Sequence, residues 1–369
     1  MIGGGQLGRM FAQEAMNLEV EVHCLDGDAF APCANVAHGF TQGSIQDYES
    51  VLQFGRNFDT ITVEMEHVSI EALSQLEREG KKVYPQPKVL SLIKDKGLQK
   101  QFYQRHGIPT ANFCLLDTTT DTLPMDLPLV QKLCVGGYDG KGIKVIRSME
   151  AWEDRFKEAS ILEEMVAFNK EISVIIARNA RGEVRSFGAV ECEFNTEANL
   201  VEFQFSPADI LPEIEQEAQA IARKIIETLD MVGILAVEFF LTKDGRLLVN
   251  EIAPRPHNSG HHTLECCITS QFAQHLRAIL NLPLGDTMLR SPGAMVNILG
   301  EKGHEGVAKF EGLENVLKIP GAYVHLYGKQ TTKPFRKMGH VTLLGMDLEE
   351  IKTKVDLVKR HFRCIATQE

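Results

Sequence analysis

Two glutamates in neighbouring apolar segments are the residues that most clearly require a chemical explanation. Glu238 lies inside the apolar stretch 235–240, and Glu251 lies inside 247–252. The Lys-Asp-Gly sequence between the two stretches predicts a β-hairpin. A two-residue Asp-Gly loop would place the two carboxylates directly opposite each other. Like charges in that position are destabilising, and burying them unpaired is costly.

A divalent cation between the carboxylates would remove the repulsion and give the pair a purpose. Oxygen ligands with few protein contacts suit Mg²⁺ that is bridged to nucleotide phosphates. We therefore predict that Glu238, Glu251 and the neighbouring Asn250 hold Mg²⁺ or Mn²⁺. Two alternatives stay open. A three-residue loop would place Asn250 opposite Glu238, and the two acids could share a proton inside a core.

A glycine-rich segment follows Lys132 and separates two short apolar stretches, 129–133 and 143–146. The glycines within residues 136–142 add nothing to a core and lose much chain entropy on ordering. They do allow the backbone to approach an anion closely, and Lys132 and Lys141 supply positive charge. The pattern predicts a flap over the phosphates of ATP; a flexible surface hairpin is the alternative.

The acidic segment 163–166, Glu-Glu-Met-Val, is followed by Glu171. A strand edge that ends in acids beside an apolar wall can bind adenine through its main chain and a ribose through a carboxylate. Taken alone, the segment fits a solvated run of charges better.

Residues 253–262, Ala-Pro-Arg-Pro-His-Asn-Ser-Gly-His-His, directly follow the second acidic strand. Two prolines restrict the chain there, so Arg255, His257 and Asn258 would be presented beside the expected metal. One cation and two hydrogen-bonding groups suit a small anion such as bicarbonate. A zinc site of His257, His261 and His262 is the competing interpretation. The lack of a thiolate or carboxylate at a suitable spacing disfavours it.

Two further segments have the composition of phosphate sites. Residues 3–8, Gly-Gly-Gly-Gln-Leu-Gly, with Asp26 beyond them, fit the dinucleotide fingerprint; a tight strand-to-helix turn is the alternative. The segment 325–340 contains Lys329, Arg336 and Lys337, which could surround a monophosphate. A solvated basic turn explains that second segment equally well.

Composition narrows the classes of function. The chain has 369 residues and a net charge of −11 with no basic cluster, so we expect no nucleic-acid partner. No apolar run approaches the roughly 18 residues that cross a bilayer, so we expect no membrane partner. The eight cysteines show no CxxC spacing and no signal peptide is evident, which suggests reduced thiols and a cytoplasmic location.

The order of predicted elements indicates α/β and α+β architecture in more than one domain. Strands and helices alternate over residues 1–93, which predicts a doubly wound parallel sheet, although only Met1 and Ile2 precede the first glycine turn. We also expect a strand over 184–190. Short strands and turns after residue 291 suggest a small, β-rich C-terminal domain.

Four motifs, in this order, resemble the N5-carboxyaminoimidazole ribonucleotide synthetases: GGGQLGRM, GGYDGKG, NEIAPRPHNSGH, and YGK followed by PFRKMGHV. The last two motifs are specific, and the resemblance covers nearly the whole chain. It implies an ATP-grasp fold with an N-terminal α/β domain, a lid, a main nucleotide-clasping subdomain and a small C-terminal domain. The implied divisions are residues 1–93, 94–160, 161–290 and 291–369.

The resemblance also implies an activity. ATP would phosphorylate bicarbonate to carboxyphosphate, and the amine of aminoimidazole ribonucleotide would capture the carboxyl group or released CO₂. A homodimer that acts on small molecules is a further implication.

Site residues follow from the same resemblance. The residues implied for ATP are Lys96, Lys132, Gly137, Tyr138, Asp139, Gly140, Lys141, Gly142, Ile143, Glu163, Glu164, Met165, Val166, Glu171, Phe194, Asn250 and Glu251. The catalytic residues implied for bicarbonate are Arg255, His257 and Asn258, with Tyr138, Asp139 and Lys141 closing over it. The residues implied for the ribonucleotide are Gly5, Gln6, Leu7, Glu64, Glu66, Arg255, Lys329, Arg336 and Lys337.

The chain departs from the family pattern at four positions. Lys96 replaces an arginine, Ile143 a glutamine, Phe194 a histidine and His67 an asparagine. A lysine is a point charge without the guanidinium fork, which changes that expected ATP contact. Three rival functions remain: an NAD-dependent oxidoreductase, a formate-dependent ligase acting on glycinamide ribonucleotide, and a non-catalytic nucleotide-binding protein.

Overall fold

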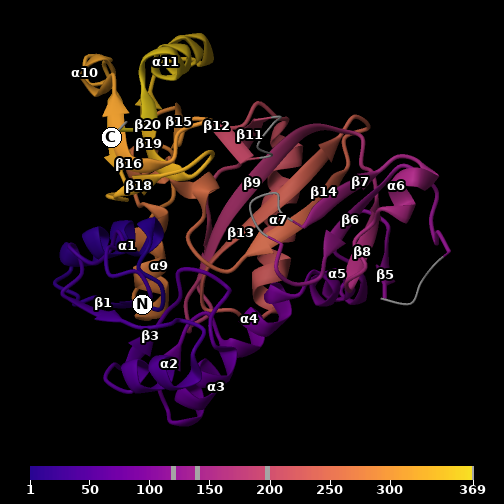
Figure 1. The fold of residues 1–369 in the computed structure, drawn as a ribbon, viewed down its shortest axis with the longest axis horizontal. Coiled ribbons are helices and arrows are strands. Elements are labelled where there is room, and N and C mark those ends of the chain that lie inside the picture. Colours follow the sequence, from indigo (N-terminus) through magenta and orange to yellow (C-terminus); the bar gives the residue numbers. More distant parts are fainter. Residues whose placement is uncertain (118–121, 138–141, 196–199, 368–369) are drawn as a thin grey trace.

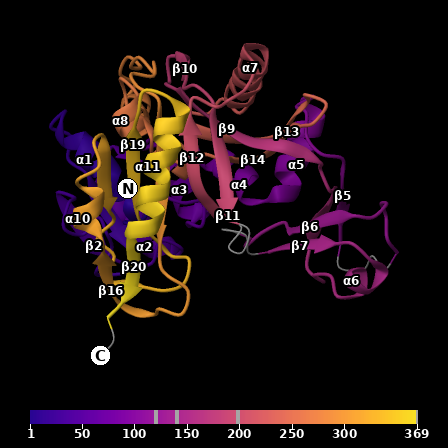
Figure 2. The same cartoon turned by 90° about the horizontal axis from the view of Figure 1, so that it is seen from above.

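The structure is a computed structural model that describes residues 1–117, 122–137, 142–195 and 200–367. The N-terminal unit and the C-terminal elements lie at one end of the molecule, and a four-stranded sheet lies at the other (Figure 1). A nine-stranded sheet extends between them, as the view from above also shows (Figure 2). In the part of the chain that is described, no helix combines the length and apolarity needed to cross a bilayer.

The N-terminal unit is built on short parallel strands. Its elements are α1 (Gln6–Met16), β1 (His23–Asp26), β2 (Gly39–Gln42), α2 (Tyr48–Gly55), β3 (Thr60–Ile61), α3 (Ile70–Arg78) and β4 (Lys82–Val83). Ile2 forms parallel bridges with Leu25 and Val63, so it joins the parallel pairs β1·β2 and β3·β4. Cys24 packs in one cluster with Phe11 of α1, while Leu25 packs in the cluster of α2 and α3. Helices therefore cover both faces, and the predicted doubly wound parallel sheet is confirmed.

Two helices, α4 (Pro87–Lys94) and α5 (Lys96–Arg105), lead into the four-stranded sheet. Asp95 begins α5 as its N-cap, because its Oδ1 accepts hydrogen bonds from the backbone N–H of Gly97 at 2.8 Å and of Leu98 at 3.1 Å. This cap fixes where α5 starts, and so fixes the direction in which its first turn projects side chains.

The four-stranded sheet, here called the lid, is antiparallel in the order β5-β8-β6-β7. Its elements are β5 (Phe113–Leu116), β6 (Leu129–Leu133), β7 (Ile143–Ile146), α6 (Met149–Glu153) and β8 (Ser160–Glu164). Trp152 of α6 is buried against Leu129, Ile146 and Leu162, which gives the lid a small core of its own.

The nine-stranded sheet carries helices on both faces. Its central elements are β9 (Phe168–Arg178), β10 (Val184–Ser186), β11 (Val190–Asn195), β12 (Leu200–Ser206), α7 (Pro212–Thr228), β13 (Gly233–Thr242), β14 (Leu247–Ala253), the 3₁₀ helix η1 (Asn258–Gly260), α8 (Thr263–Cys266) and α9 (Gln271–Ile279). The strand expected over 184–190 is thus divided between β10 and β11. On β9, Ile172 and Val174 pack with α7, while Ile175 and Ala177 pack with α9. Because strand residues alternate between faces, Glu171 and Ser173 lie on the face opposite α7.

The C-terminal elements extend the same sheet and add a smaller one. They are β15 (Gly293–Leu299), β16 (Gly306–Glu311), α10 (Leu313–Val316), β17 (Ala322–Leu326), β18 (Thr331–Thr332), β19 (Lys337–Leu344), α11 (Leu348–His361) and β20 (Arg363–Ala366). Strand β15 pairs with β12, so the large sheet is continuous from β14 to β17, while β16, β18 and β20 form a separate sheet. The predicted β-rich C-terminal region therefore shares its main sheet with the centre of the molecule.

Candidate active site

The hairpin β13–β14 places Glu238 and Glu251 directly opposite each other. The loop has three residues, because the N–H of Thr242 donates to the carbonyl of Arg246 at 3.0 Å and Gly245 adopts a φ of +83°. The predicted two-residue loop was therefore wrong. The predicted pairing is nevertheless confirmed, because the register shifts by one residue between Glu238 and the next pair along the strands.

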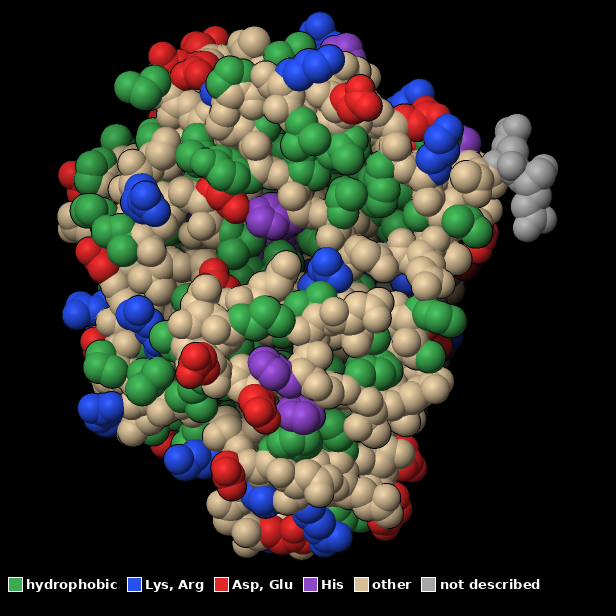
Figure 3. Space-filling model, turned by 90° about the vertical axis from the view of Figure 1, so that its left-hand side faces the viewer, with side chains coloured by type: hydrophobic (Ala, Val, Ile, Leu, Met, Phe, Trp, Pro, Cys, Tyr) green, Lys and Arg blue, Asp and Glu red, His purple; other side chains and the backbone are tan. Residues whose placement is uncertain are grey.

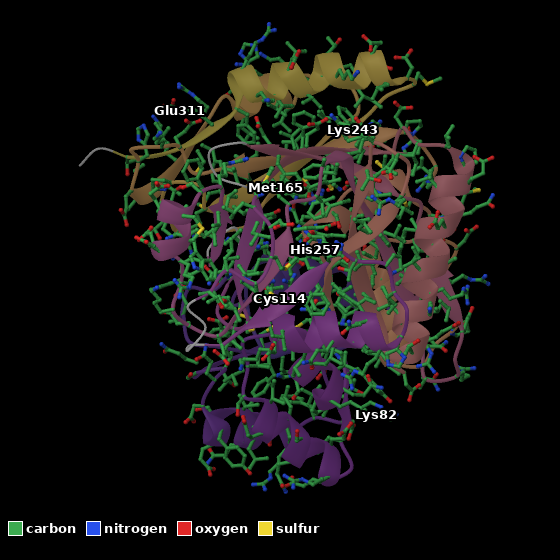
Figure 4. All side chains as sticks on the ribbon, turned by 90° about the vertical axis from the view of Figure 1, so that its right-hand side faces the viewer. Lys82, Cys114, Met165, Lys243, His257 and Glu311 are labelled. Carbon is green, nitrogen blue, oxygen red and sulfur yellow. The ribbon has the colours of Figure 1, made fainter. Side chains whose placement is uncertain are left out.

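That shift is a β-bulge at Asn250, and it re-aims two neighbouring side chains. In a regular strand, Asn250 and Glu251 would point to opposite faces. Here the Oδ1 of Asn250 accepts a hydrogen bond from Lys132 Nζ at 2.8 Å, and the Oε2 of Glu251 lies 2.7 Å from Lys96 Nζ. Both side chains thus contact lysines: Lys132 belongs to the lid, and Lys96 belongs to α5. In Figure 4, Lys243 marks the turn of this hairpin and His257 follows its second strand.

The surroundings shift the pKa values of the two carboxylates in opposite directions. Burial raises the pKa of Glu238, and the negative charges of Glu251 and Glu171 raise it further. The ammonium of Lys96 holds the pKa of Glu251 below its usual value, against the effect of burial. His257 Nε2 lies 3.6 Å from Glu238 Oε1. Lys96 therefore compensates the charge of Glu251, whereas burial and the neighbouring carboxylates disfavour ionisation of Glu238.

Among the described residues, no group of three or more His, Cys, Asp or Glu side chains is arranged to hold a metal ion. The histidines of the zinc alternative are directed to separate partners: the Nδ1 of His261 lies 3.0 Å from Gln271 Nε2, and the Nδ1 of His262 lies 3.1 Å from the carbonyl of Ser259. Any metal at Glu238 and Glu251 would need further ligands from nucleotide or water.

Glu163 is enclosed by two lysines. It is 3% exposed, its Oε2 lies 2.6 Å from Lys132 Nζ, and its Oε1 forms an ion pair with Lys100 Nζ. A solvated run of charges is therefore the wrong interpretation for this residue. Glu164 accepts a hydrogen bond from Asn112 Nδ2 at 2.8 Å at the more exposed side of β8.

Lys100 is a site residue that sequence reasoning missed. The available signal was its spacing: Lys100 follows Lys96 by four residues in a helix that begins at Asp95, so both lysines project from one face. Lys96 reaches Glu251 and Lys100 reaches Glu163, which links α5 to both acidic strands.

The glycine-rich loop is described only at its base. Lys132 pairs with Ile143 across β6 and β7, and Gly136 and Gly142 adopt φ values of +88° and +74°, which favour glycine. Tyr138, Asp139, Gly140 and Lys141 lie outside the described residues, and their roles stay predictions. Gly137 is the last described residue before that gap.

Two more residues predicted for ATP face the same region. Burial raises the pKa of Glu171 to about 7. Phe194, one strand away on β11, packs partly buried against Val190, Cys192 and Val201. A carboxyl group and an aromatic ring therefore stand on adjacent strands β9 and β11 of the large sheet.

The segment after β14 is fixed by side-chain hydrogen bonds. Ser259 Oγ lies 2.8 Å from Ser173 Oγ and 2.9 Å from His257 Nδ1. The amide of Asn258 forms a reciprocal pair with Asn297 of β15, at 2.9 and 2.8 Å. Asn258 therefore anchors this segment to β15, and its predicted contact with bicarbonate stays a prediction. Neither Ser173 nor Asn297 carried a recognisable sequence signal.

The glycine turn at residues 3–8 holds carboxylates of its own chain. The N–H of Gly4 donates to Asp26 Oδ2 at 2.7 Å, that of Leu7 donates to Glu64 Oε1 at 2.9 Å, and that of Gly5 donates to Glu64 Oε2. Glu64 is 4% exposed. These amides hold carboxylates of the chain itself, and contact of Gly5, Leu7 and Glu64 with the ribonucleotide stays a prediction. The alternative of a tight structural turn is the better description; Gln6, at the start of α1, takes no part in these bonds.

Glu66 of the N-terminal unit forms an ion pair with Arg255, which follows β14. Arg255 Nε lies 3.0 Å from Glu66 Oε1, and both side chains are partly exposed. This contact places a residue predicted for the ribonucleotide beside one predicted for bicarbonate. The N-terminal unit and the end of β14 are therefore joined at the predicted catalytic segment.

A hollow of about 180 Å³ lies between the N-terminal unit and the C-terminal elements. It is lined by Asp28, Phe30, Pro32, Lys329, Gln330, Thr331 and Arg336. Figure 3 shows the side of the molecule on which these two parts meet, with acidic and basic side chains interspersed. Lys329 and Arg336 are thus brought together as predicted. The carbonyl of Lys337 accepts a hydrogen bond from Lys329 Nζ at 2.6 Å, and the positive charge of Lys337 favours the ionised form of Glu238; its contact with the ribonucleotide stays a prediction.

Two sheets that enclose lysines and carboxylates define the class of this protein: it is an ATP-grasp ligase. A model of the ATP-grasp domain matches residues 101–272. Residues 1–94 match the ribonucleotide synthetase preATP-grasp domain, and residues 293–354 match the phosphoribosylaminoimidazole carboxylase C-terminal domain. With these matches and the relatives described next, the chain belongs to the N5-carboxyaminoimidazole ribonucleotide synthase family.

Three relatives in that family match over nearly their whole length. The N5-carboxyaminoimidazole ribonucleotide synthase of Bacillus subtilis is 39% identical over 364 residues, which cover 95% of this chain and 92% of that protein. The crystal structure of the synthetase from Thermotoga maritima is 40% identical, with a TM-score of 0.92 over 99% of this chain and 98% of that one. The synthase from Aspergillus clavatus, solved with ADP and 5-aminoimidazole ribonucleotide, is 33% identical, with a TM-score of 0.87 and 97% of each chain covered. The oxidoreductase alternative is therefore wrong.

Proposed function

We infer that this chain catalyses the ATP- and bicarbonate-dependent carboxylation of 5-aminoimidazole ribonucleotide to N5-carboxyaminoimidazole ribonucleotide, a step of purine biosynthesis. Family membership supports this activity. The observation that carries it within the molecule is the facing pair Glu238 and Glu251, flanked by Lys96 and Lys132. Carboxylates and cations so arranged suit a charged nucleotide rather than a neutral substrate.

We propose that Glu238, Glu251 and Asn250 hold Mg²⁺ together with the nucleotide, and that Mn²⁺ can substitute. All three offer oxygen donors, which these ions prefer. Lys96, 2.7 Å from Glu251, supplies the positive charge at that carboxylate in this structure. When bound, the ion would offset the charge of the phosphates during transfer.

The nucleotide would lie between the lid and the large sheet. Lys132 and Lys96 would meet its phosphates, Glu171 its ribose, and the main chain of residues 164–166 its adenine, with Phe194 beside it. The loop 137–143 would close over the phosphates and exclude water, which protects a short-lived intermediate. Glu163 holds Lys132 in this arrangement.

The chemistry consists of two displacements. A bicarbonate oxygen attacks the terminal phosphorus of ATP, the bond from that phosphorus to ADP breaks, and carboxyphosphate forms. The exocyclic amine of the ribonucleotide then attacks the carboxyl carbon, either directly or after CO₂ is released, and phosphate and a proton leave. Arg255 and His257 would orient the bicarbonate, because a cation and a hydrogen-bonding ring next to the acidic pair suit that anion.

The ribonucleotide would bind with its phosphate in the hollow that Lys329 and Arg336 line. Its base would then point toward Glu66 and Arg255, which are already paired at 3.0 Å. We further propose a homodimer that acts in the cytoplasm on these small molecules. Sedimentation equilibrium should give about twice the chain mass of 41.2 kDa; the monomer mass would contradict the dimer.

Release of ADP from purified protein tests the function. ATP, Mg²⁺, bicarbonate and 5-aminoimidazole ribonucleotide are supplied together, and each is then omitted in turn. Full turnover should need all four. Stimulation by formate with glycinamide ribonucleotide, and not by bicarbonate, would favour the formate-dependent ligase, and ATP binding without turnover on either set would favour a non-catalytic protein.

A further inference from the structure

Lys100 is the most deeply buried cation near the site, and the predicted chemistry gives it no task. It is 3% exposed, and its ammonium contacts Glu163 Oε1 and Thr110 Oγ1. Thr110 in turn donates to the carbonyl of Val249 at 2.7 Å, which ties this group to β14. The ammonium of Lys100 is thus engaged by Glu163 and Thr110. Burying a lysine is costly, so its presence requires a purpose.

Glu163 shares its two oxygens between two lysines. Oε1 pairs with Lys100, and Oε2 lies 2.6 Å from Lys132, which also donates a hydrogen bond to the neutral amide of Asn250 at 2.8 Å. Two positive charges and one negative charge make this triad net positive. Without Lys100, Glu163 would cancel the charge of Lys132, and an approaching phosphate would meet a neutral pair.

We propose that Lys100 is a positioning residue that neutralises Glu163, so that Lys132 keeps its full positive charge for the nucleotide phosphates. The inference rests on the proposed binding of nucleotide at Lys132. Lys100 acts through Glu163 and touches no substrate. It therefore differs from Lys96, which faces Glu251 and is partly exposed.

The electrostatics of the triad agree with this role. Burial would raise the pKa of Glu163, but Lys132 and Lys100 outweigh it and hold the pKa below its usual value. Burial lowers the pKa of Lys100, and Glu163 opposes that shift. Without Lys100, the only lysine left beside Glu163 would be Lys132, and a bound phosphate would compete with Glu163 for it. Glu163 would then take up a proton when nucleotide binds, because the protonated acid leaves Lys132 to the phosphate.

The test is calorimetric titration of the full-length protein with Mg²⁺-ADP in two buffers of different ionisation enthalpy. Wild type should bind with no proton uptake from this group. Lys100→Met should weaken binding by about tenfold, because a change of about one pKa unit corresponds to a tenfold change in affinity. Binding to this variant should also be accompanied by proton uptake. Its affinity should improve as the pH falls. The double variant Lys100→Met/Glu163→Gln should regain part of that affinity and lose the proton uptake.

Lys354→Met is the matched control. Lys354 is a largely buried lysine of α11 that pairs with Glu350 at 2.8 Å, remote from the nucleotide region in sequence and fold. The Lys354→Met variant should bind Mg²⁺-ADP with the same affinity as wild type. If Lys100→Met does not fold, Lys100→Gln takes its place, because its shorter amide can still donate a hydrogen bond.

Wild-type affinity in the lysine variant, with no proton uptake, would overturn the proposal. Equal weakening in the control would also overturn it, since any lost ion pair would then have the same effect. Failure of the proposed function looks different, because wild type itself would then not bind Mg²⁺-ADP.

Discussion

Glu64 and Glu163 are two glutamates with nearly the same burial and opposite surroundings. They are 4% and 3% exposed. Glu64 accepts hydrogen bonds from backbone amides at the start of α1, while Glu163 lies between two lysines. Burial raises the pKa of Glu64 although those amides oppose it, whereas the lysines hold the pKa of Glu163 below its usual value.

The difference shows what each environment can do for a bound anion. Partial charges on amides make burial of one carboxylate tolerable, but they leave nothing for a second anion once that carboxylate is in place. Two full positive charges around one carboxylate leave a net positive charge that can attract a phosphate. The glycine turn that has the sequence of a phosphate site therefore holds carboxylates of its own chain, while we propose that the segment with the sequence of a solvated charge run supports the nucleotide site.

The largest expected effect is on stability when Glu163 is lost. Glu163→Met would leave Lys100 buried with only the neutral hydroxyl of Thr110 as a partner, and breaking a buried ion pair in this way costs about 3–5 kcal/mol. Trp152, the single tryptophan, is buried in the lid, so its fluorescence in a urea titration reports unfolding there. The double variant Lys100→Met/Glu163→Met should be less destabilised than the single one. An equally or more destabilised double variant would mean that packing, and not charge, holds this site together.

A smaller effect is expected at the N-terminal unit. Glu64→Ala leaves the amides of Gly5 and Leu7 without their acceptor, at a cost of about 1–3 kcal/mol. Differential scanning calorimetry should show this loss, while calorimetric titration with Mg²⁺-ADP should show unchanged affinity. A large loss of ADP affinity would mean that the turn binds nucleotide after all.

The pH dependence of Glu64 should have the opposite sign to that of Glu163. Folding raises the pKa of Glu64, so its contribution to stability is complete below the unfolded pKa and is lost as the pH rises through the folded pKa. The stability advantage of wild type over Glu64→Gln should therefore shrink as the pH rises. Folding lowers the pKa of Glu163, so its contribution is lost as the pH falls.

Much of the fold could be predicted because hydrophobic periodicity and turn residues are local signals. The strands 129–133 and 143–146 have the bounds that their apolar patterns suggest. Strand β2, at Gly39–Gln42, was missed, since its burial is partial and no apolar alternation marks it. That the C-terminal strands continue the large sheet depends on pairing between β12 and β15, which are far apart in the chain.

The site could be predicted as a set of residues, but not as a set of contacts. The pairing of Glu238 with Glu251 was found through a loop length that was wrong, because the bulge at Asn250 compensates for the longer turn. The hydrogen bonds from the glycine turn to Glu64 and the ion pair of Lys100 with Glu163 join residues that meet only after folding. Charge type and spacing identify candidates, and the tertiary partner decides which of them remain available to a ligand.

The smallest expected effect concerns Glu171, which adds a third kind of surroundings to the comparison of Glu64 with Glu163. It is a largely buried carboxyl group, and among the described residues neither a backbone amide nor a lysine lies at hydrogen-bonding distance from it. Burial raises its pKa to about 7, while the charge of Lys132 opposes the shift. The ionised form is the better acceptor for ribose hydroxyls, so the affinity for Mg²⁺-ADP should rise about threefold as the pH increases from roughly 6 to 8, which titrates such a group. Glu171→Gln should flatten this profile, and Glu79→Gln, at an exposed carboxylate paired with Arg56, should leave it unchanged. An unaltered slope in Glu171→Gln would assign the titration to another group and remove Glu171 from the ribose site.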